Sequence, residues 1–361
     1  MASLLDPIQI GDISLPNRVI MAPLTRLHGT PDNIPTPLMV EYYTQRSSAG
    51  LIISEGIPVL PSGVGYACVP GIWSPTQTAA WKPVTDSVHR VGGRIFAQLW
   101  HVGRISDPRF LDGNLPVAPS AIRPAGHVSL VRPITEYVTP RALQLSEIPA
   151  IVEGFRKGAE NAKLAGFDGV EIHGANGYLI DQFLQDGSNH RTDEYGGSIE
   201  NRARLMLEVA DAVISVWGAQ RVGMHLAPRG DSHEMHDSNP PATFGYVARE
   251  LGRRGLAFLC AREYFGPDRL GPQIKKQFGG VYIVNEKYTQ ALAEQVIQDG
   301  EADAVAFGQL FISNPDLPAR FASNSPLNAP QPSTYFTPGP HGYTDYPALS
   351  ASEESMAPAG K

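Results

Sequence analysis

The residues best suited to catalysis lie close together, just after an apolar run that ends near residue 172. His173 and Asn176 stand three residues apart, and both side chains can donate a hydrogen bond to one ligand oxygen. Such a pair would polarise a carbonyl group as an oxyanion hole does. Tyr178 follows, and a phenol can move a proton when its neighbours shift its pKa. Singly, each residue could simply complete loop hydrogen bonds; together they are predicted to be catalytic.

A repeating pattern of elements would position these side chains. Eight short apolar runs recur along the 361 residues, and most are continuous rather than alternating, which is typical of parallel strands buried on both faces. Intervening segments carry apolar residues at three- and four-residue steps, as amphipathic helices do. The predicted strands are Val19–Ala22, Leu51–Ser54, Arg94–Leu99, Gly169–Ile172, Arg221–Leu226, Leu256–Cys260, Val281–Ile283 and Ala304–Phe307, and the clearest helices are Thr76–Val91, Glu147–Leu164, Ile199–Val216 and Lys287–Gln298.

This alternation predicts an α/β fold, a (β/α)8 TIM barrel. An open doubly wound sheet would need a glycine-rich turn after its first strand, where the chain reads Pro23-Leu-Thr-Arg26. One connection is too long for a barrel loop, and we interpret residues 102–146 as a cap inserted over the mouth after strand three. Residues 1–349 are predicted to form one domain and residues 350–361 a disordered tail.

Composition narrows the classes of function. The net charge is −7 without a basic patch, which argues against nucleic-acid binding, and no apolar run is long enough to span a membrane. The first residues do not read as a signal peptide, so we expect a cytoplasmic protein with a small-molecule substrate. His233 and His236 flank Glu234 but lack the spacing of a zinc helix, so no metal site is predicted. The oligomeric state is not predicted.

Several long segments resemble the old yellow enzyme family across nearly the whole chain. They are Asn17–Arg26, Gln98–Arg104, Asp181–Arg202, Ala304–Gly308, Phe311–Asp316 and Gly342–Pro347. Members of that family are FMN-dependent ene-reductases with a (β/α)8 barrel, which pass a hydride from NAD(P)H through the flavin to an activated alkene. The resemblance therefore implies the same fold, the same cofactors and the same reaction for this chain.

The resemblance also assigns roles by position. Thr25, Gly56, Gln98 and Gly308 would contact the flavin. The two donors at 173 and 176 would hold the carbonyl oxygen of the substrate, and the tyrosine at 178 would deliver the proton to its α-carbon.

Three positions depart from the family pattern where it holds FMN. His225 stands in place of an arginine at the flavin ring, Gln309 in place of an arginine at the phosphate, and Glu286 in place of a glycine beside the phosphate. Arginine offers a permanently charged, bidentate partner that glutamine cannot supply, and a carboxylate there would repel the phosphate. Together these changes would cost ~4–7 kcal/mol of FMN binding.

On this basis the sequence favours a flavin-independent, redox-neutral isomerase or cyclase acting on a conjugated carbonyl compound, in secondary metabolism. Tyr178 or His225 would move the proton, and Tyr66, Trp100, Tyr335 and Phe336 would line an enlarged pocket. The alternative is an FMN-dependent ene-reductase, in which case NAD(P)H is the reductant. A third class, a binding protein on an inherited barrel, gives no reason to keep the catalytic cluster.

Overall fold

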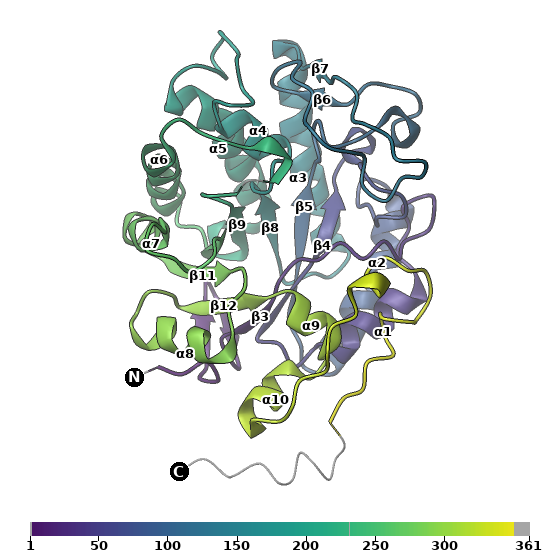
Figure 1. Ribbon diagram of the computed structural model, residues 1–361, viewed down its shortest axis with the longest axis vertical. Helices are drawn as coiled ribbons and strands as arrows, with labels where there is room; N and C mark the ends of the chain where they lie inside the picture. Colours follow the sequence, from purple (N-terminus) through teal and green to yellow (C-terminus); the bar gives the residue numbers. More distant parts are fainter. Residues whose placement is uncertain (1, 231, 350–361) are drawn as a thin grey trace.

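A closed barrel of eight parallel strands forms the centre of the molecule, as the sequence predicts (Figure 1). The computed structural model describes residues 2–230 and 232–349, so the predicted tail 350–361 lies outside the described residues. The strands, in their order around the barrel, are β3 (Val19–Met21), β4 (Leu51–Pro58), β5 (Ile95–Trp100), β8 (Gly169–His173), β9 (Val222–Leu226), β10 (Phe258–Arg262), β11 (Val281–Asn285) and β12 (Ala304–Phe307).

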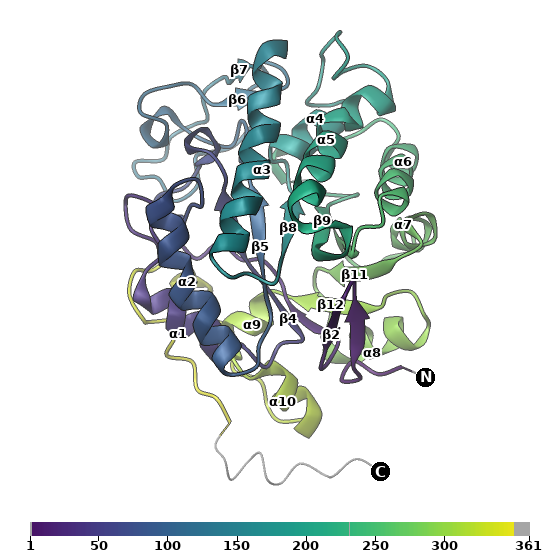
Figure 2. The same ribbon diagram turned by 180° about the vertical axis from the view of Figure 1, so that it is seen from behind.

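Helices surround the barrel on its outer side (Figures 1 and 2). Their first turns use the expected capping chemistry: Ser74 accepts from the backbone N–H of Gln77 in a capping box, and Ser198 and Thr289 cap two other helices. The α-helices are α1 (Pro37–Gln45), α2 (Pro75–Arg90), α3 (Ile148–Leu164), α4 (Leu179–Leu184), α5 (Ile199–Trp217), α6 (Pro240–Arg253), α7 (Gly271–Phe278), α8 (Gln290–Gln298), α9 (Gln309–Ser313) and α10 (Leu317–Ser323).

An N-terminal hairpin closes the base of the barrel, where the strands begin. Strands β1 (Ile8–Ile10) and β2 (Ile13–Leu15) pair antiparallel. Their apolar side chains belong to the same buried cluster as Phe96 and Phe258 of the barrel interior. The hairpin therefore closes the interior of the barrel at this end with apolar side chains.

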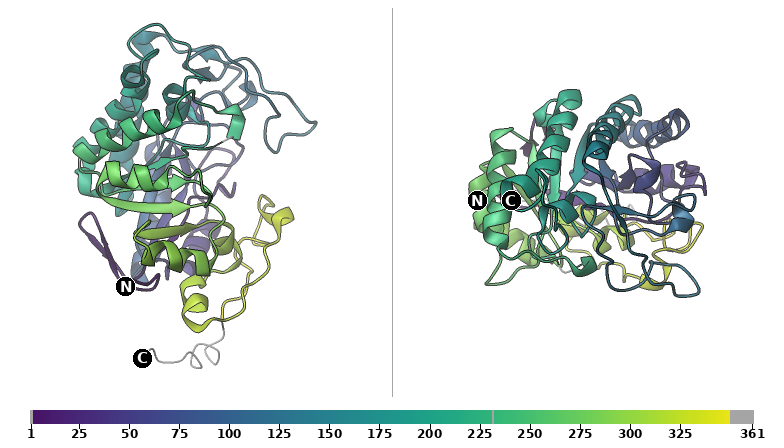
Figure 3. Two further views of the ribbon diagram at one scale, coloured as in Figure 1. Left: turned by 60° about the vertical axis from the view of Figure 1, so that its left-hand side comes forward. Right: turned by 90° about the horizontal axis from the view of Figure 1, so that it is seen from above.

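Residues 102–146 connect β5 to α3 on the mouth side, opposite the hairpin (Figure 3, left). This segment contains the short parallel pair β6 (Val117–Ala118) and β7 (Arg141–Ala142). Val128, Val131 and Tyr137 join a buried apolar cluster with Trp100. The segment thus packs against the mouth-side end of β5.

Candidate active site

The turn after β8 holds the predicted catalytic side chains. His173 is the last residue of β8 and is buried. Asn176 and Gly177 follow with φ of 60° and 76°, a left-handed pair that reverses the chain above the barrel. Tyr178 precedes α4, whose Asp181 accepts a hydrogen bond of 2.8 Å from the Gly177 N–H. The turn is therefore held by its own helix.

Aromatic rings surround Tyr178. Its ring lies edge-on to Trp100 and His173, with centroid distances of 4.9 Å and 5.0 Å. The ring of His233 is tilted against it, with a centroid distance of 5.5 Å. Its hydroxyl is 3.0 Å from the hydroxyl of Tyr66. Burial, followed by the nearby Tyr66 hydroxyl, raises the pKa of Tyr178 well above its ordinary value. This phenol therefore keeps its proton at neutral pH until a reaction takes it.

A second polar layer lies one step deeper in the barrel. Gln98 donates through Nε2 to Glu171 Oε2 at 2.8 Å and lies 3.2 Å from His225 Nδ1. Burial raises the pKa of Glu171 to about 8 and lowers the pKa of His225 to about 3. Both side chains are therefore neutral at pH 7. Because the Gln98 amide donates to Nδ1, the proton of His225 is assigned to Nε2, which faces away from this layer.

Several buried polar atoms around the mouth have no hydrogen-bond partner among the described residues. They are Trp100 Nε1, Glu171 Oε1, His173 Nδ1 and His225 Nε2. An unpaired buried donor or acceptor costs about 1–3 kcal/mol, so a set of them on neighbouring strands needs a physical reason. A bound ligand with several donors and acceptors along one edge would supply the missing partners.

Arg262, which was not predicted as a site residue, also lies at the mouth. It ends β10, which runs two residues beyond the predicted end at Cys260. Its Nη1 donates to Asn176 Oδ1 at 3.0 Å and to Ser232 Oγ at 2.9 Å, while its Nε lies 2.5 Å from Glu286 Oε2. A charged residue close after an apolar barrel strand predicts a site residue, and this pattern could have identified Arg262 from the sequence.

This pairing corrects the expectation for Glu286. From the sequence, its carboxylate was expected to be an uncompensated negative charge at the phosphate position. In the structure the Arg262 guanidinium binds both carboxylate oxygens, the second at 3.3 Å, so the two charges largely cancel. Gln309 is the first residue of α9 and is exposed.

The residues predicted to touch the flavin are distributed around the rim. Thr25 follows β3, Gly308 follows β12, and Gln98 is in β5. Gly56 lies in β4, where a Cβ atom would approach the Trp100 ring to 2.7 Å, so glycine is also required there for packing.

The predicted pocket walls separate into two pairs. Tyr66 and Trp100 stack at 5.7 Å beside the catalytic cluster. Tyr335 and Phe336 are not brought to that cluster. The centroid of the Tyr335 ring lies 5.9 Å from Cζ of Arg26, and Phe336 is 46% exposed. The carboxyl-terminal segment instead packs around the buried Arg26, whose Nη2 donates to the Gly342 carbonyl at 2.7 Å. Attraction of aromatic faces and carbonyls to this cation explains the placement.

The His233–His236 loop lies over the site and is tied down by protein groups. His233 Nδ1 is 2.8 Å from the Asn176 carbonyl oxygen, and Glu234 accepts a hydrogen bond of 2.6 Å from the Ala125 N–H. Among the described residues, no group of three or more His, Cys, Asp or Glu side chains is arranged to hold a metal ion. None of the described helices is long and apolar enough to cross a membrane.

Comparison with known proteins gives extensive matches. Residues 3–328 match the NADH:flavin oxidoreductase / NADH oxidase family. A protein named putative 12-oxophytodienoate reductase 3 of Oryza sativa subsp. japonica is 43% identical over 98% of this chain and 94% of its own. A probable flavin mononucleotide-dependent alkene reductase of Leishmania infantum is 41% identical over 96% of this chain and 97% of its own.

Two solved structures are similar along their whole length. Morphinone reductase, solved with tetrahydroNAD, has a TM-score of 0.94 and 49% identity over 98% of this chain and 99% of its own. The old yellow enzyme homologue of Zymomonas mobilis has a TM-score of 0.94 and 45% identity over 96% of this chain and all of its own.

These relatives overturn the sequence-based preference for a flavin-independent isomerase or cyclase. Each of the four is named as a reductase or an old yellow enzyme homologue, and one is named as dependent on flavin mononucleotide. The preference rested on three substitutions, and one of them, Glu286, is neutralised by an arginine that the sequence did not bring to notice. The chain belongs to the NADH:flavin oxidoreductase / NADH oxidase family.

Proposed function

We propose that this chain is an FMN-dependent ene-reductase, which reduces the activated C=C bond of a small conjugated carbonyl compound with electrons from NAD(P)H. One observation carries the proposal: His173, Asn176 and Tyr178 lie at the mouth together with buried polar atoms that lack partners among the described residues. When bound, FMN supplies the hydride that it has taken from NAD(P)H.

The ring end of FMN fits the residues at the mouth. The pyrimidine edge of a flavin presents alternating donors and acceptors, and the His225 Nε2 donor has no partner within the described chain. Gln98 lies beside it and is held in place by Glu171. These residues would hold the ring edge without a guanidinium at position 225.

The phosphate end offers less positive charge. The Arg262 charge is committed to Glu286, and Gln309 can offer only neutral donors. Lys287, exposed in the loop after β11, is the nearest cation in sequence. We therefore expect FMN to bind through its ring more than through its phosphate.

The side chains of the protein divide the remaining work. His173 and Asn176 donate to the substrate's carbonyl oxygen, which withdraws electrons from the β-carbon and stabilises negative charge that develops on the oxygen. Burial lowers the pKa of His173, so the imidazole acts as a neutral donor. Tyr178 holds the proton for the α-carbon, and Trp100 packs beside it to exclude water.

The proposal is tested with purified protein and added FMN under anaerobic conditions. We expect the protein to retain FMN on gel filtration and to convert 2-cyclohexen-1-one to cyclohexanone with one NAD(P)H consumed per ketone formed. Omission of FMN from flavin-stripped protein is the control. Failure of the FMN-loaded protein to reduce any member of a panel of enones, enals and maleimides would overturn the proposal.

A further inference from the structure

The guanidinium of Arg262 links the substrate-binding asparagine to the loop after β11. Three hydrogen bonds and one ion-pair contact join it to three side chains: Asn176 Oδ1, Ser232 Oγ and both oxygens of Glu286. The side chains of Arg262 and Glu286 are 30% and 20% exposed, so solvent only partly competes for these contacts. The network lies across the ends of β8, β9, β10 and β11.

This contact decides which end of the Asn176 amide faces the substrate. An arginine side chain has only donors, so the atom 3.0 Å from its Nη1 must be the amide oxygen. The Nδ2 group then points to the other side and is the end that can donate to a carbonyl oxygen. Without the guanidinium, the amide could turn over and present an acceptor, which would repel that oxygen.

The backbone at Glu286 supports a specific need for its carboxylate. Glu286 and Lys287 have φ of 98° and 58°, a conformation that favours glycine. Non-glycine residues held in such conformations persist where the surroundings fix them. From this position the Glu286 carboxylate contacts Arg262 through both oxygens, so the strained loop places the acid that orients the arginine.

We propose that Arg262 is a positioning residue that fixes the Asn176 amide with its Nδ2 toward the substrate oxygen, and that Glu286 holds Arg262 for this purpose. The inference rests on the proposed function, because it assigns Asn176 the role of donor to a carbonyl oxygen. Arg262 acts through Asn176 and needs no contact with the substrate.

A double-mutant cycle tests the proposal with 4-nitrophenolate, whose flat ring and anionic oxygen resemble the oxygen end of an activated enone. The affinity of the FMN-loaded protein is measured by calorimetry for the wild type, R262Q, N176A and the double variant. Glutamine at 262 offers both a donor and an acceptor and so no longer selects one amide orientation. We expect each single variant to bind about tenfold more weakly and the double variant to bind no more weakly than N176A.

Two further variants separate positioning from a general structural role. R262K keeps a cationic donor opposite the Asn176 oxygen but not the several-sided guanidinium, and it is expected to lose less affinity than R262Q. R269Q removes an arginine of similar exposure that pairs with Glu301 at 2.8 Å, and it is expected to leave the affinity unchanged. A full tenfold loss in R269Q would mean that any such ion pair matters and would overturn the proposal.

The remaining outcomes are distinguishable. Additive losses in the double variant, or no loss in R262Q, would overturn the positioning role. A loss of FMN affinity in R262Q, measured by flavin fluorescence, as large as its loss of probe affinity would overturn it too, because Arg262 would then act on the cofactor. If the wild type reduces no alkene, the proposed function fails, while the cycle still reports whether Arg262 orients Asn176.

Discussion

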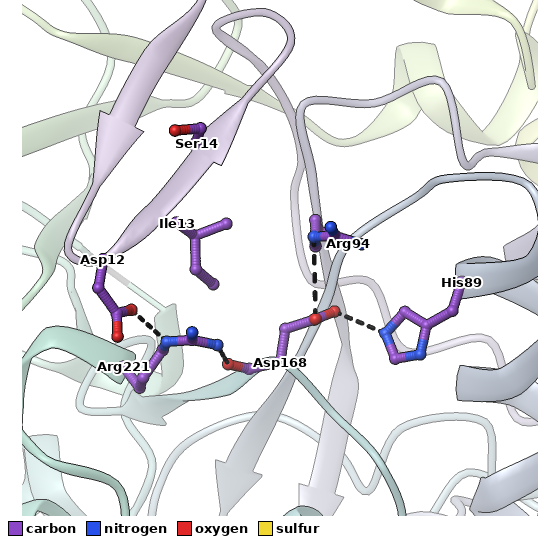
Figure 4. Close-up of a pocket in the computed structure, with 7 residues that line it drawn as sticks. All are labelled: Asp12, Ile13, Ser14, His89, Arg94, Asp168 and Arg221. Atoms are coloured by element: carbon purple, nitrogen blue, oxygen red, sulfur yellow. Dashed lines mark hydrogen bonds and ion pairs between the residues drawn. The ribbon is translucent and has the colours of Figure 1, made fainter.

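The two ends of the barrel both carry polar side chains but use them differently. At the base, an open depression of about 400 Å³ contains five charged or titratable groups that bind one another (Figure 4). Asp168 accepts from His89 Nε2 at 2.9 Å and lies 3.9 Å from Arg94, while Arg221 pairs with Asp12 and donates to the Asp168 carbonyl at 2.8 Å.

At the mouth, Trp100, Glu171, His173 and His225 each keep a buried polar atom without a partner among the described residues. The charged side chains in Figure 4 are instead partly exposed and bind one another: the Asp12 and Arg94 side chains are 56% and 42% exposed. Paired groups lower the free energy of the fold, whereas unpaired buried groups raise it and are retained where a ligand completes them. The groups at the base therefore act within the fold, whereas the unpaired atoms at the mouth are ones that a ligand would complete.

The largest expected effect comes from removing the hydroxyl group of Tyr178, which holds the proton for the substrate. Tyr178→Phe should lower kcat for enone reduction by about 10²–10³-fold, because no other donor replaces the phenol. Thermal unfolding should change little, since the hydroxyl bonds only to Tyr66 within the described chain. Stopped-flow measurement of alkene reduction checks the rate. Tyr66→Phe is the matched control and should stay within about tenfold, because it only supports Tyr178. Equal losses in both variants would assign the proton to the pair.

The next prediction concerns how the buried Glu171 carboxyl makes the free energy of unfolding depend on pH. Burial raises the pKa of Glu171 to about 8, whereas its ordinary value is 4.5. The folded state therefore holds a proton that the unfolded state has lost, and stability falls as pH rises from about 4.5 to 8. Glu171→Gln keeps an acceptor for Gln98 but cannot ionise.

The free energy of unfolding, measured in urea at pH 5 and pH 9, should therefore fall less in Glu171→Gln than in the wild type, by a few kcal/mol. Glu55 and Asp181 have pKa values raised to about 7 by burial, and they contribute equally to both proteins. Parallel pH profiles for the two proteins would mean that Glu171 is already ionised in the folded state.

Most of the fold could be predicted because it depends on local pattern. All eight barrel strands were found from short apolar runs, most of them continuous, and the closed barrel confirms the fold class. The hairpin β1–β2 was missed, although its alternation around Gly11-Asp12 was visible. The end of β10 was placed two residues early, which removed Arg262 from the list of strand-end residues.

The sequence brought together those members of the candidate site that are close to one another along the chain. His173, Asn176 and Tyr178 lie within six residues and one turn. The Arg262–Glu286 pair could not be found in this way, because its partners come from neighbouring strands and meet only when the barrel closes. The sequence therefore showed the added carboxylate but not the guanidinium that neutralises it.

A substitution at the base should lower stability and leave activity unchanged, whereas Tyr178→Phe at the mouth should do the reverse. Asp168→Asn removes the carboxylate charge that both His89 and Arg94 contact. It should therefore lower the free energy of unfolding by about 1–2 kcal/mol. The ratio kcat/KM should be unchanged, because the depression lies at the end of the barrel away from Tyr178. The exposed Asp211, paired with Arg254, is the control, and Asp211→Asn should cost less than about 0.5 kcal/mol. A change in kcat/KM with unchanged stability would contradict the division between the two ends.

The smallest expected effect comes from adding a charge at the mouth. Gln309 is exposed at the start of α9, where the resemblance places the FMN phosphate, and it offers no positive charge. Gln309→Arg should strengthen FMN binding about tenfold, since a hydrogen bond to a charged group contributes ~1.5–3 kcal/mol and exposure reduces that gain. Flavin fluorescence titration measures the dissociation constant. Gln298→Arg, exposed at the end of α8, adds the same charge elsewhere and should leave it unchanged. Equal gains in both variants would reflect only the protein's net charge of −7, whereas a gain specific to position 309 would place the phosphate at α9.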